Sequence, residues 1–252
     1  MKLFKLSRAI FYEYFREKIF YFIFFVAFGM LLFSFVFQEM VVGEEGKVFK
    51  DMALTGITLI AVAIPIFITS QMISQQISRR SIYLLLSLPL SSNSLVVAHL
   101  LASLYIIVIS ILSLAILSFA VLLPYGLWLK PLLIHSYLSI LAGAVLSSWA
   151  LFFSSLLSST LSAITSAIIY FLGAVFDSAL DYVRLRPGRF SHYLLEVLKY
   201  IVPNMGFFNL KPELIYNLPY PTEKLFFALI YAISQVVVLT LLSAYILSRK
   251  EL

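Results

Sequence analysis

The sequence predicts an all-α, polytopic membrane protein, a single domain over residues 1–252 with six transmembrane helices, an N-terminal interfacial helix and a short cytoplasmic helix. Hydrophobic residues make up 62% of the chain and charged residues only 12%. This balance, with a mean hydropathy of +1.01, excludes an ordinary soluble enzyme. Apolar runs of about 20 residues, the length that crosses a bilayer, lie at Ile19–Phe37, Met52–Ile73, Leu95–Leu123, Leu132–Leu157, Leu161–Leu180 and Leu225–Leu247.

Residues 1–18 predict a helix that lies in the membrane interface. One helical face of this segment is apolar, with Leu3, Leu6, Ile10 and Tyr14. The other faces carry the residues that we assign to the interface, Lys2, Lys5, Arg8 and Arg16. Basic side chains there can meet anionic headgroups while the apolar groups enter the acyl region. The simpler alternative is a charged leader that only sets topology.

The second span contains Pro65 near its middle. Proline removes one backbone hydrogen bond and should bend the helix at this point.

Small polar residues crowd the fourth and fifth spans: Ser147, Ser148, Ser154, Ser155, Ser158, Ser159, Thr160, Ser162, Thr165 and Ser166. Close helix packing is the favoured interpretation, and a polar pathway for a substrate is the alternative. The connection between these spans has no charged residue, which predicts a tight hairpin at the inner surface.

After the fifth span the composition changes to charged residues, Asn and Pro, which predicts an extracytoplasmic loop over residues 181–224. Within it, Phe190–Val202 has the apolar spacing of a short helix that rests on the outer interface. Pro203 cannot continue that helix.

The segment 74–94, between the second and third spans, is too polar at its start for the membrane and too apolar at its centre for a solvated loop. A helix over Gln75–Ser87 would place Gln75, Gln76, Arg79 and Arg80 on one side, and Pro89 would end it. Such a helix could fill a groove on a soluble partner. Its candidate docking residues are Gln75, Gln76, Arg79, Arg80, Ser81, Ile82, Leu84, Leu85 and Pro89. The alternative is an interfacial helix whose arginines only set topology.

The distribution of Lys and Arg predicts that both termini face the cytoplasm. Basic residues gather in the leading segment, in the loop with Arg79 and Arg80, and in the tail with Arg249 and Lys250. The loops after the first and third spans carry only Lys47, Lys50 and Lys130. The long loop 181–224 is also basic, but long loops count less in this rule.

The loop after the second span also matches the pattern of a known family, whose first cytoplasmic loop runs from an acidic residue through basic residues, Gly-Thr and a leucine-rich turn to hydrophobic-Pro-hydrophobic-Ser-Arg, with a Lys further on. Here Gln76 stands at the acidic position, Arg79 is among the basic residues and Ser81 stands at the Thr. The leucine turn and the proline segment are matched by Leu84, Leu85, Leu86, Leu88, Pro89, Leu90 and Ser91. Arg80, Ser92 and His99 depart from the pattern at its Gly, Arg and Lys positions. In this loop, in the leader Tyr14–Lys18, in Ile201–Asn204 and in the closing Ser248–Leu252, the chain resembles the ABC-2 type permeases, especially those found beside copper-enzyme maturation systems.

The resemblance implies the permease subunit of an ATP-driven transporter in the cytoplasmic (inner) membrane, which moves a substrate, most simply outward. Two six-helix subunits would pair, as a homodimer or with a second permease. The segment 74–94 would be the coupling helix that docks on a separate ABC ATPase subunit, and that subunit would bind ATP and Mg. The chain contains no GxxxxGK[ST] stretch to cradle phosphates, so we expect neither ATPase activity nor a cofactor in this subunit.

Other classes of function have weaker support in the sequence. An intramembrane enzyme would have to use Asp177 with Asp181, which are better explained by surface ion pairing. The histidines, His99, His135 and His192, lie apart without carboxylates at metal-ligand spacing, so packed or interfacial histidines are expected rather than a metal site. An ion-driven carrier would need charges inside the spans, and nucleic-acid binding would need a basic stripe. A non-transporting scaffold or immunity-type protein on the same fold remains an alternative.

Overall fold

The computed structural model describes residues 2–39, 45–78, 92–122, 129–184 and 202–249, and every regular element in these ranges is helical. The elements in chain order are α1 (Lys2–Arg16), α2 (Lys18–Glu39), α3 (Glu45–Ile64), η1 (Pro65–Thr69), α4 (Ser70–Ser78), α6 (Ser92–Leu122), α7 (Leu129–Leu156), α8 (Ser159–Arg184), η3 (Met205–Phe208), α10 (Lys211–Ile215) and α11 (Glu223–Arg249). The all-helical prediction is therefore confirmed for the described part of the chain.

Five helical stretches are long and apolar enough to cross a membrane: Lys18–Phe37, Gly46–Gln76, Asn93–Val121, Leu129–Leu156 and Glu223–Arg249. The chain is thus a multi-pass membrane protein. The fifth predicted span, Leu161–Leu180, falls within α8, but the apolar helix found there, Ser159–Val175, is shorter than the other five stretches. The sixth crossing stays a prediction.

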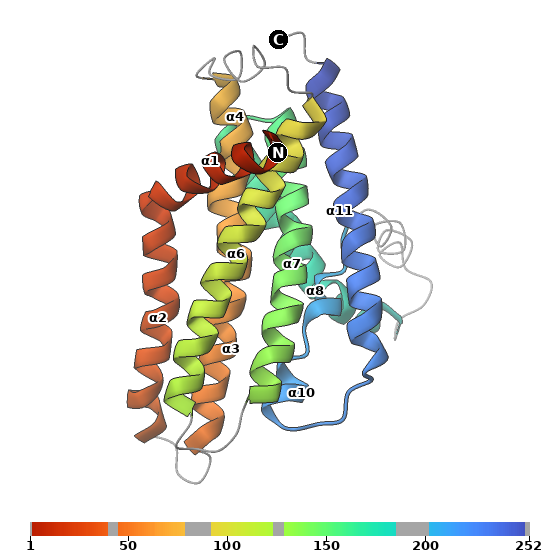
Figure 1. Ribbon diagram of the computed structural model, residues 1–252. Coiled ribbons are helices and arrows are strands. Elements are labelled where there is room, and N and C mark those ends of the chain that lie inside the picture. The colour runs from red at the N-terminus through yellow and green to blue at the C-terminus, as the bar shows by residue number, and fades with distance from the viewer. Residues whose placement is uncertain (1, 40–44, 79–91, 123–128, 185–201, 250–252) are drawn as a thin grey trace.

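The long helices form one bundle. The helices α2, α3, α6, α7 and α11 run along its length, and α1 crosses one end (Figure 1). We call this the terminal end, where α1, α4 and the C-terminal end of α11 lie, and we call the opposite end, near α10, the distal end (Figure 1).

Branched apolar side chains fill the interior of the bundle, and small residues let the helix backbones come close. Ile57, Ile60, Ile106 and Leu138 are fully or almost fully buried. A Cβ atom added to Gly56 would lie 3.1 Å from the Ala27 carbonyl oxygen of α2. One added to Gly143 of α7 would lie 3.2 Å from the Ala61 carbonyl oxygen of α3. Such contacts are typical of membrane helices, whose association depends on close packing.

The irregularity expected at Pro65 takes the form of a π-helical turn. Elements α3, η1 and α4 follow one another without a break in the chain, and η1 begins at Pro65 itself. The Ser70 backbone N–H donates to the Pro65 carbonyl oxygen, five residues back. Proline removes an N–H and crowds the preceding turn, and a π turn accommodates both effects within a continuous helix.

Six of the ten small polar residues named for the fourth and fifth spans are buried in the bundle: Ser147, Ser148, Ser154, Ser155, Ser162 and Ser166. The two helices are joined by Leu157 and Ser158 alone, which confirms a tight hairpin. The Ser162 hydroxyl donates to the Ala150 carbonyl oxygen across the hairpin (3.3 Å). The hydroxyls of Ser148, Ser155, Thr165 and Ser166 donate to carbonyl oxygens of their own helix, and that of Ser154 accepts from the Ser74 backbone N–H of α4 (3.0 Å).

Part of the predicted loop 181–224 packs on the bundle. The element η3 packs against α7 and α8, and α10 packs against α3 and α7. The residues that this segment buries are Val202, Pro203, Met205, Phe208, Leu210, Leu214 and Ile215. The predicted helix Phe190–Val202 falls almost entirely outside the described residues.

Candidate functional site

The predicted docking segment begins at the terminal end of the bundle. Gln75 and Gln76 lie in α4, whereas Arg79, Arg80, Ser81, Ile82, Leu84, Leu85 and Pro89 lie outside the described residues. The helices on either side, α4 and α6, both meet the undescribed segment at this end (Figure 1). Both attachment points of the segment are therefore at the terminal end.

Gln76 belongs to a buried polar cluster with His99 and Tyr14, the α1–α4–α6 cluster. The His99 Nε2 atom lies 3.1 Å from the Gln76 side-chain oxygen, and its Nδ1 atom lies 3.4 Å from the Tyr14 hydroxyl. Tyr14 and His99 are fully buried, and Gln76 is 7% exposed. The amide oxygen can only accept, so Nε2 carries the proton and Nδ1 accepts from Tyr14. Both ring nitrogens are thus satisfied by one tautomer.

This cluster joins three elements that are far apart in the sequence. Tyr14 comes from α1, Gln76 from the last turns of α4 and His99 from the first turns of α6. Burial raises the pKa of the Tyr14 hydroxyl, which therefore stays a donor at physiological pH. Because buried polar groups are costly to leave unpaired, the cluster holds α1 against the two helices that frame the predicted docking segment.

The interfacial residues of α1 lie opposite its buried face. Ser7, Ile10 and Tyr14 are buried, and α1 packs mainly on α6. The predicted interfacial side chains of Lys5, Arg8 and Arg16 are exposed, and Lys2 begins the helix. The Arg8 guanidinium donates to the Tyr12 hydroxyl (3.3 Å) and lies 5.8 Å from its ring centroid. The amphipathic pattern of this segment is thereby confirmed, and its place in a membrane interface stays a prediction.

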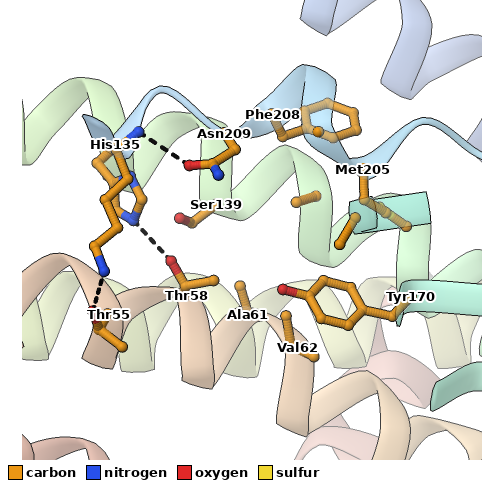
Figure 2. A pocket seen from close by; sticks show the side chains of 14 residues that line it. Thr55, Thr58, Ala61, Val62, His135, Ser139, Tyr170, Met205, Phe208 and Asn209 are labelled. Carbon is orange, nitrogen blue, oxygen red and sulfur yellow. Dashed lines mark hydrogen bonds between the residues drawn. The ribbon is translucent and has the colours of Figure 1, made fainter. Parts of the chain in front are cut away.

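A mainly apolar cavity of about 150 Å³, with several polar side chains in its wall, lies in the distal half of the bundle. Its walls come from α3, α7, α8 and the η3 segment (Figure 2). The side chains that contribute polar atoms are Thr55, Thr58, His135, Ser139, Tyr170, Asn209 and Lys211.

His135 is fixed in this wall by two contacts of one ring nitrogen. Its Nε2 atom lies 2.9 Å from the Leu54 carbonyl oxygen and 2.9 Å from the Thr58 hydroxyl. The carbonyl can only accept, so Nε2 carries a proton. The buried Nδ1 atom has no hydrogen-bond partner among the described residues.

Two lysines hold the segment after η3 against α3. Lys211 pairs with Asp51 at 2.7 Å and also donates to the Thr55 hydroxyl. Lys50, only 1% exposed, donates to the Ile215 carbonyl oxygen (3.4 Å) and to the Asn217 side-chain oxygen (3.3 Å). Asn217 has a φ of 54°, in the left-handed region that Asn tolerates better than most residues. These contacts fasten the segment after η3 to α3, and Lys211 also lines the cavity.

The residues considered for other chemistry do not gather into one site. No group of three or more His, Cys, Asp or Glu suited to a metal occurs among the described residues. His99 and His135 are buried and hydrogen-bonded in separate places, and His192 lies outside the described part. Asp177 and Asp181 lie in α8, and their pairing stays a prediction.

Comparison with known proteins adds no assignment: no family model matches the chain, and no curated protein does.

Sequence reasoning missed both of these polar sites. His99 and His135 were expected to be packed, but their partners could not be named. Gln76 lies at the end of one span and His99 near the start of the next, so both lie at a similar depth at the terminal end of the bundle. That similar depth was the available signal for their contact. Lys211 carried no comparable signal, because its partner Asp51 lies far away in the sequence.

Proposed function

We propose that the chain is the permease subunit of an ATP-driven transporter of the ABC-2 type. The sequence pattern around Arg79–Pro89 and the multi-pass helical bundle support this proposal. A separate ATPase subunit binds ATP and Mg and docks on the segment 74–94. In this proposal α8 supplies the sixth crossing, both termini are cytoplasmic and the substrate moves outward.

The observation that carries the proposal is the way in which the docking segment is attached. The element α3–η1–α4 runs from the distal end of the bundle directly into that segment, and α6 leaves it (Figure 1). The Gln76–His99 hydrogen bond joins these two helices beside it. A displacement of this segment by an ATPase would therefore move α4, α6 and α1 together, as a rigid-body switch between two transporter conformations requires.

The size of the distal cavity supports pairing with a second permease subunit. Pockets for small molecules usually measure about 300–1,000 Å³, whereas the cavity holds about 150 Å³. A transport route wide enough for a metabolite is therefore expected between two subunits rather than inside one.

Co-purification of an ATPase with the tagged full-length chain tests this proposal. We expect an ABC ATPase subunit from the source organism to stay bound in mild detergent. Replacing both arginines of the docking segment (Arg79→Ala with Arg80→Ala) should weaken the complex and slow its assembly, because charges at the rim of an interface steer association.

The matched control removes two exposed cations at the same end of the bundle, in the variant Lys5→Ala with Arg16→Ala. This control should leave the complex intact. Equal binding by the wild type and the Arg79/Arg80 variant, or equal loss in both variants, would contradict docking at the segment 74–94.

A further inference from the structure

A groove made of two adjoining pockets lies between α2 and the π-helical region, beginning at the terminal end of the bundle. Its polar part, of about 300 Å³, is lined by Glu17, Lys18, Ile19, Phe67, Ile68, Gln71, Met72 and Gln75. Its apolar part, of about 250 Å³, is lined by Ile19, Phe22, Ile23, Val26, Leu59, Ala63 and Phe67. The two parts share Ile19 and Phe67 and therefore adjoin, and we call them together the α2–η1 groove.

The π turn places one aromatic side chain at the junction of these two parts. Within η1, Pro65, Ile66, Ile68 and Thr69 are buried, whereas Phe67 is 44% exposed. A π turn inserts an extra residue into the helix and commonly marks a functional position. Here the turn directs Phe67 toward α2, where it lines both the polar and the apolar part of the groove.

The polar part lies at the depth where lipid headgroups are expected. One membrane-spanning stretch begins at Lys18, and the next one ends at Gln76. Glu17, the residue between α1 and α2, and Gln71 and Gln75 of α4 therefore lie where these spans leave the hydrocarbon core. The apolar part extends from there between α2 and α3, as a lipid chain would.

The polar part presents both charges and both kinds of hydrogen-bonding group. Glu17 and Lys18 are exposed neighbours of opposite charge, and neither forms an ion pair with another described residue. The Gln75 amide nitrogen donates to the Gln71 side-chain oxygen (3.1 Å). That bond leaves the Gln71 amide nitrogen as a donor and the Gln75 oxygen as an acceptor.

We propose that the α2–η1 groove binds one phospholipid with an ethanolamine headgroup. The lipid phosphate meets Lys18 and the Gln71 amide nitrogen, and the lipid ammonium meets Glu17 and the Gln75 oxygen. One acyl chain lies along Phe67, Phe22 and Val26. A choline headgroup has no N–H to donate to Glu17, and an anionic glycerol headgroup offers no positive charge to it, so both bind more weakly.

Native mass spectrometry of the full-length, delipidated chain in detergent tests this site without an ATPase present. The chain is titrated separately with phosphatidylethanolamine, phosphatidylcholine and phosphatidylglycerol of identical acyl chains. We expect one phosphatidylethanolamine per chain, bound about tenfold more tightly than the other two, the size of effect that one charge-assisted hydrogen bond produces. Equal binding of the three lipids, or preference for phosphatidylglycerol, would overturn the proposal.

Matched variants then locate the site. Glu17→Gln should remove the preference for ethanolamine, and Phe67→Ala should lower phosphatidylethanolamine binding several-fold. Phe25→Ala is the control, because Phe25 lies on α2, is 72% exposed and does not line the groove. Equal losses of phosphatidylethanolamine binding in the Phe67 and Phe25 variants would show general lipid contact and would overturn the proposal. The result does not depend on the proposed transport function, because the experiment contains no ATPase.

Discussion

The His99 Nε2 atom of α6 donates a hydrogen bond to the Gln76 side-chain oxygen of α4 across 3.1 Å, and both residues are buried. This bond joins the helices that precede and follow the chain segment on which an ATPase subunit is proposed to dock. Because Tyr14 of α1 donates to the other ring nitrogen of His99, the imidazole is the point where three helices meet.

Loss of that imidazole should destabilise the protein. In His99→Leu, Tyr14 and Gln76 lose their shared partner, and a lost buried hydrogen bond that leaves its partner unsatisfied costs about 1–3 kcal/mol. We therefore expect a lower unfolding temperature in detergent, measured by intrinsic fluorescence. Tyr14→Phe, which removes one bond only, should have a smaller effect.

Ser113→Ala is the control for these variants, because among the described residues the Ser113 hydroxyl bonds only to the Ser110 carbonyl oxygen of its own helix (2.9 Å). It should stay within about 0.5 kcal/mol of the wild type. An unfolding temperature for His99→Leu equal to that of Ser113→Ala would contradict the role given to the cluster.

Gly173 should not tolerate even a methyl group. A Cβ atom there would collide with the Pro203 carbonyl oxygen, so α8 and the η3 segment would have to separate. We expect Gly173→Ala to cost about 1–3 kcal/mol and to speed proteolysis between residues 202 and 210. In contrast, Gly29→Ala meets nothing within 4 Å and should be neutral or slightly stabilising. Similar behaviour of the two variants would refute the close contact.

The Lys211–Asp51 ion pair should limit access to the distal cavity. The chain contains no cysteine, so Ser139→Cys places a single thiol in the cavity wall. Adding Lys211→Met should raise the rate of maleimide labelling about fivefold, because partly exposed ion pairs contribute about 1 kcal/mol or less. Labelling of the exposed Glu223→Cys should not respond to Lys211→Met. An unchanged rate at Ser139→Cys would mean that other contacts, such as those of Lys50, keep the cavity closed.

The proposed orientation can be tested with single cysteines at opposite ends of the bundle. Pro212→Cys in α10 should react with an impermeant maleimide in intact cells, whereas Arg16→Cys in α1 should react only after lysis. Both positions are exposed, so a difference reports the side of the membrane. The reverse pattern would place both termini outside the cytoplasm.

Composition and helical spacing were sufficient to predict most of the bundle. Five of the six apolar runs correspond to helices able to cross a membrane. In lipid every backbone N–H and C=O group must be hydrogen-bonded within the protein, and for a single long apolar run a helix achieves this. The amphipathic pattern of α1 and the small-residue packing of α7 and α8 followed from the same local signals. The packing of η3 and α10 could not be predicted, since their few turns carry no period and depend on distant partners such as Lys50 and Asp51.

The orientation of α4 illustrates a second limit. Spacing predicts which residues share a helical side, but not which side faces inward. The π turn at Pro65 adds one residue to the helix, which turns everything after it by about 100°. Gln76 consequently faces His99, whereas Gln75 remains half-buried beside the α2–η1 groove. The predicted docking residue Gln76 is therefore buried and bonded to His99.

The short link between α7 and α8 decides how the distal cavity can change shape. Only Leu157 and Ser158 connect the two helices, and Ser162 is bonded to Ala150 across the turn. This short connection limits how far one helix can slide along the other. Changes in the volume of the cavity therefore depend on residues 202–222, which side-chain contacts fasten to α3. Lys50 of α3 donates to Ile215 and Asn217 of this segment, and Lys211 of the segment pairs with Asp51 of α3.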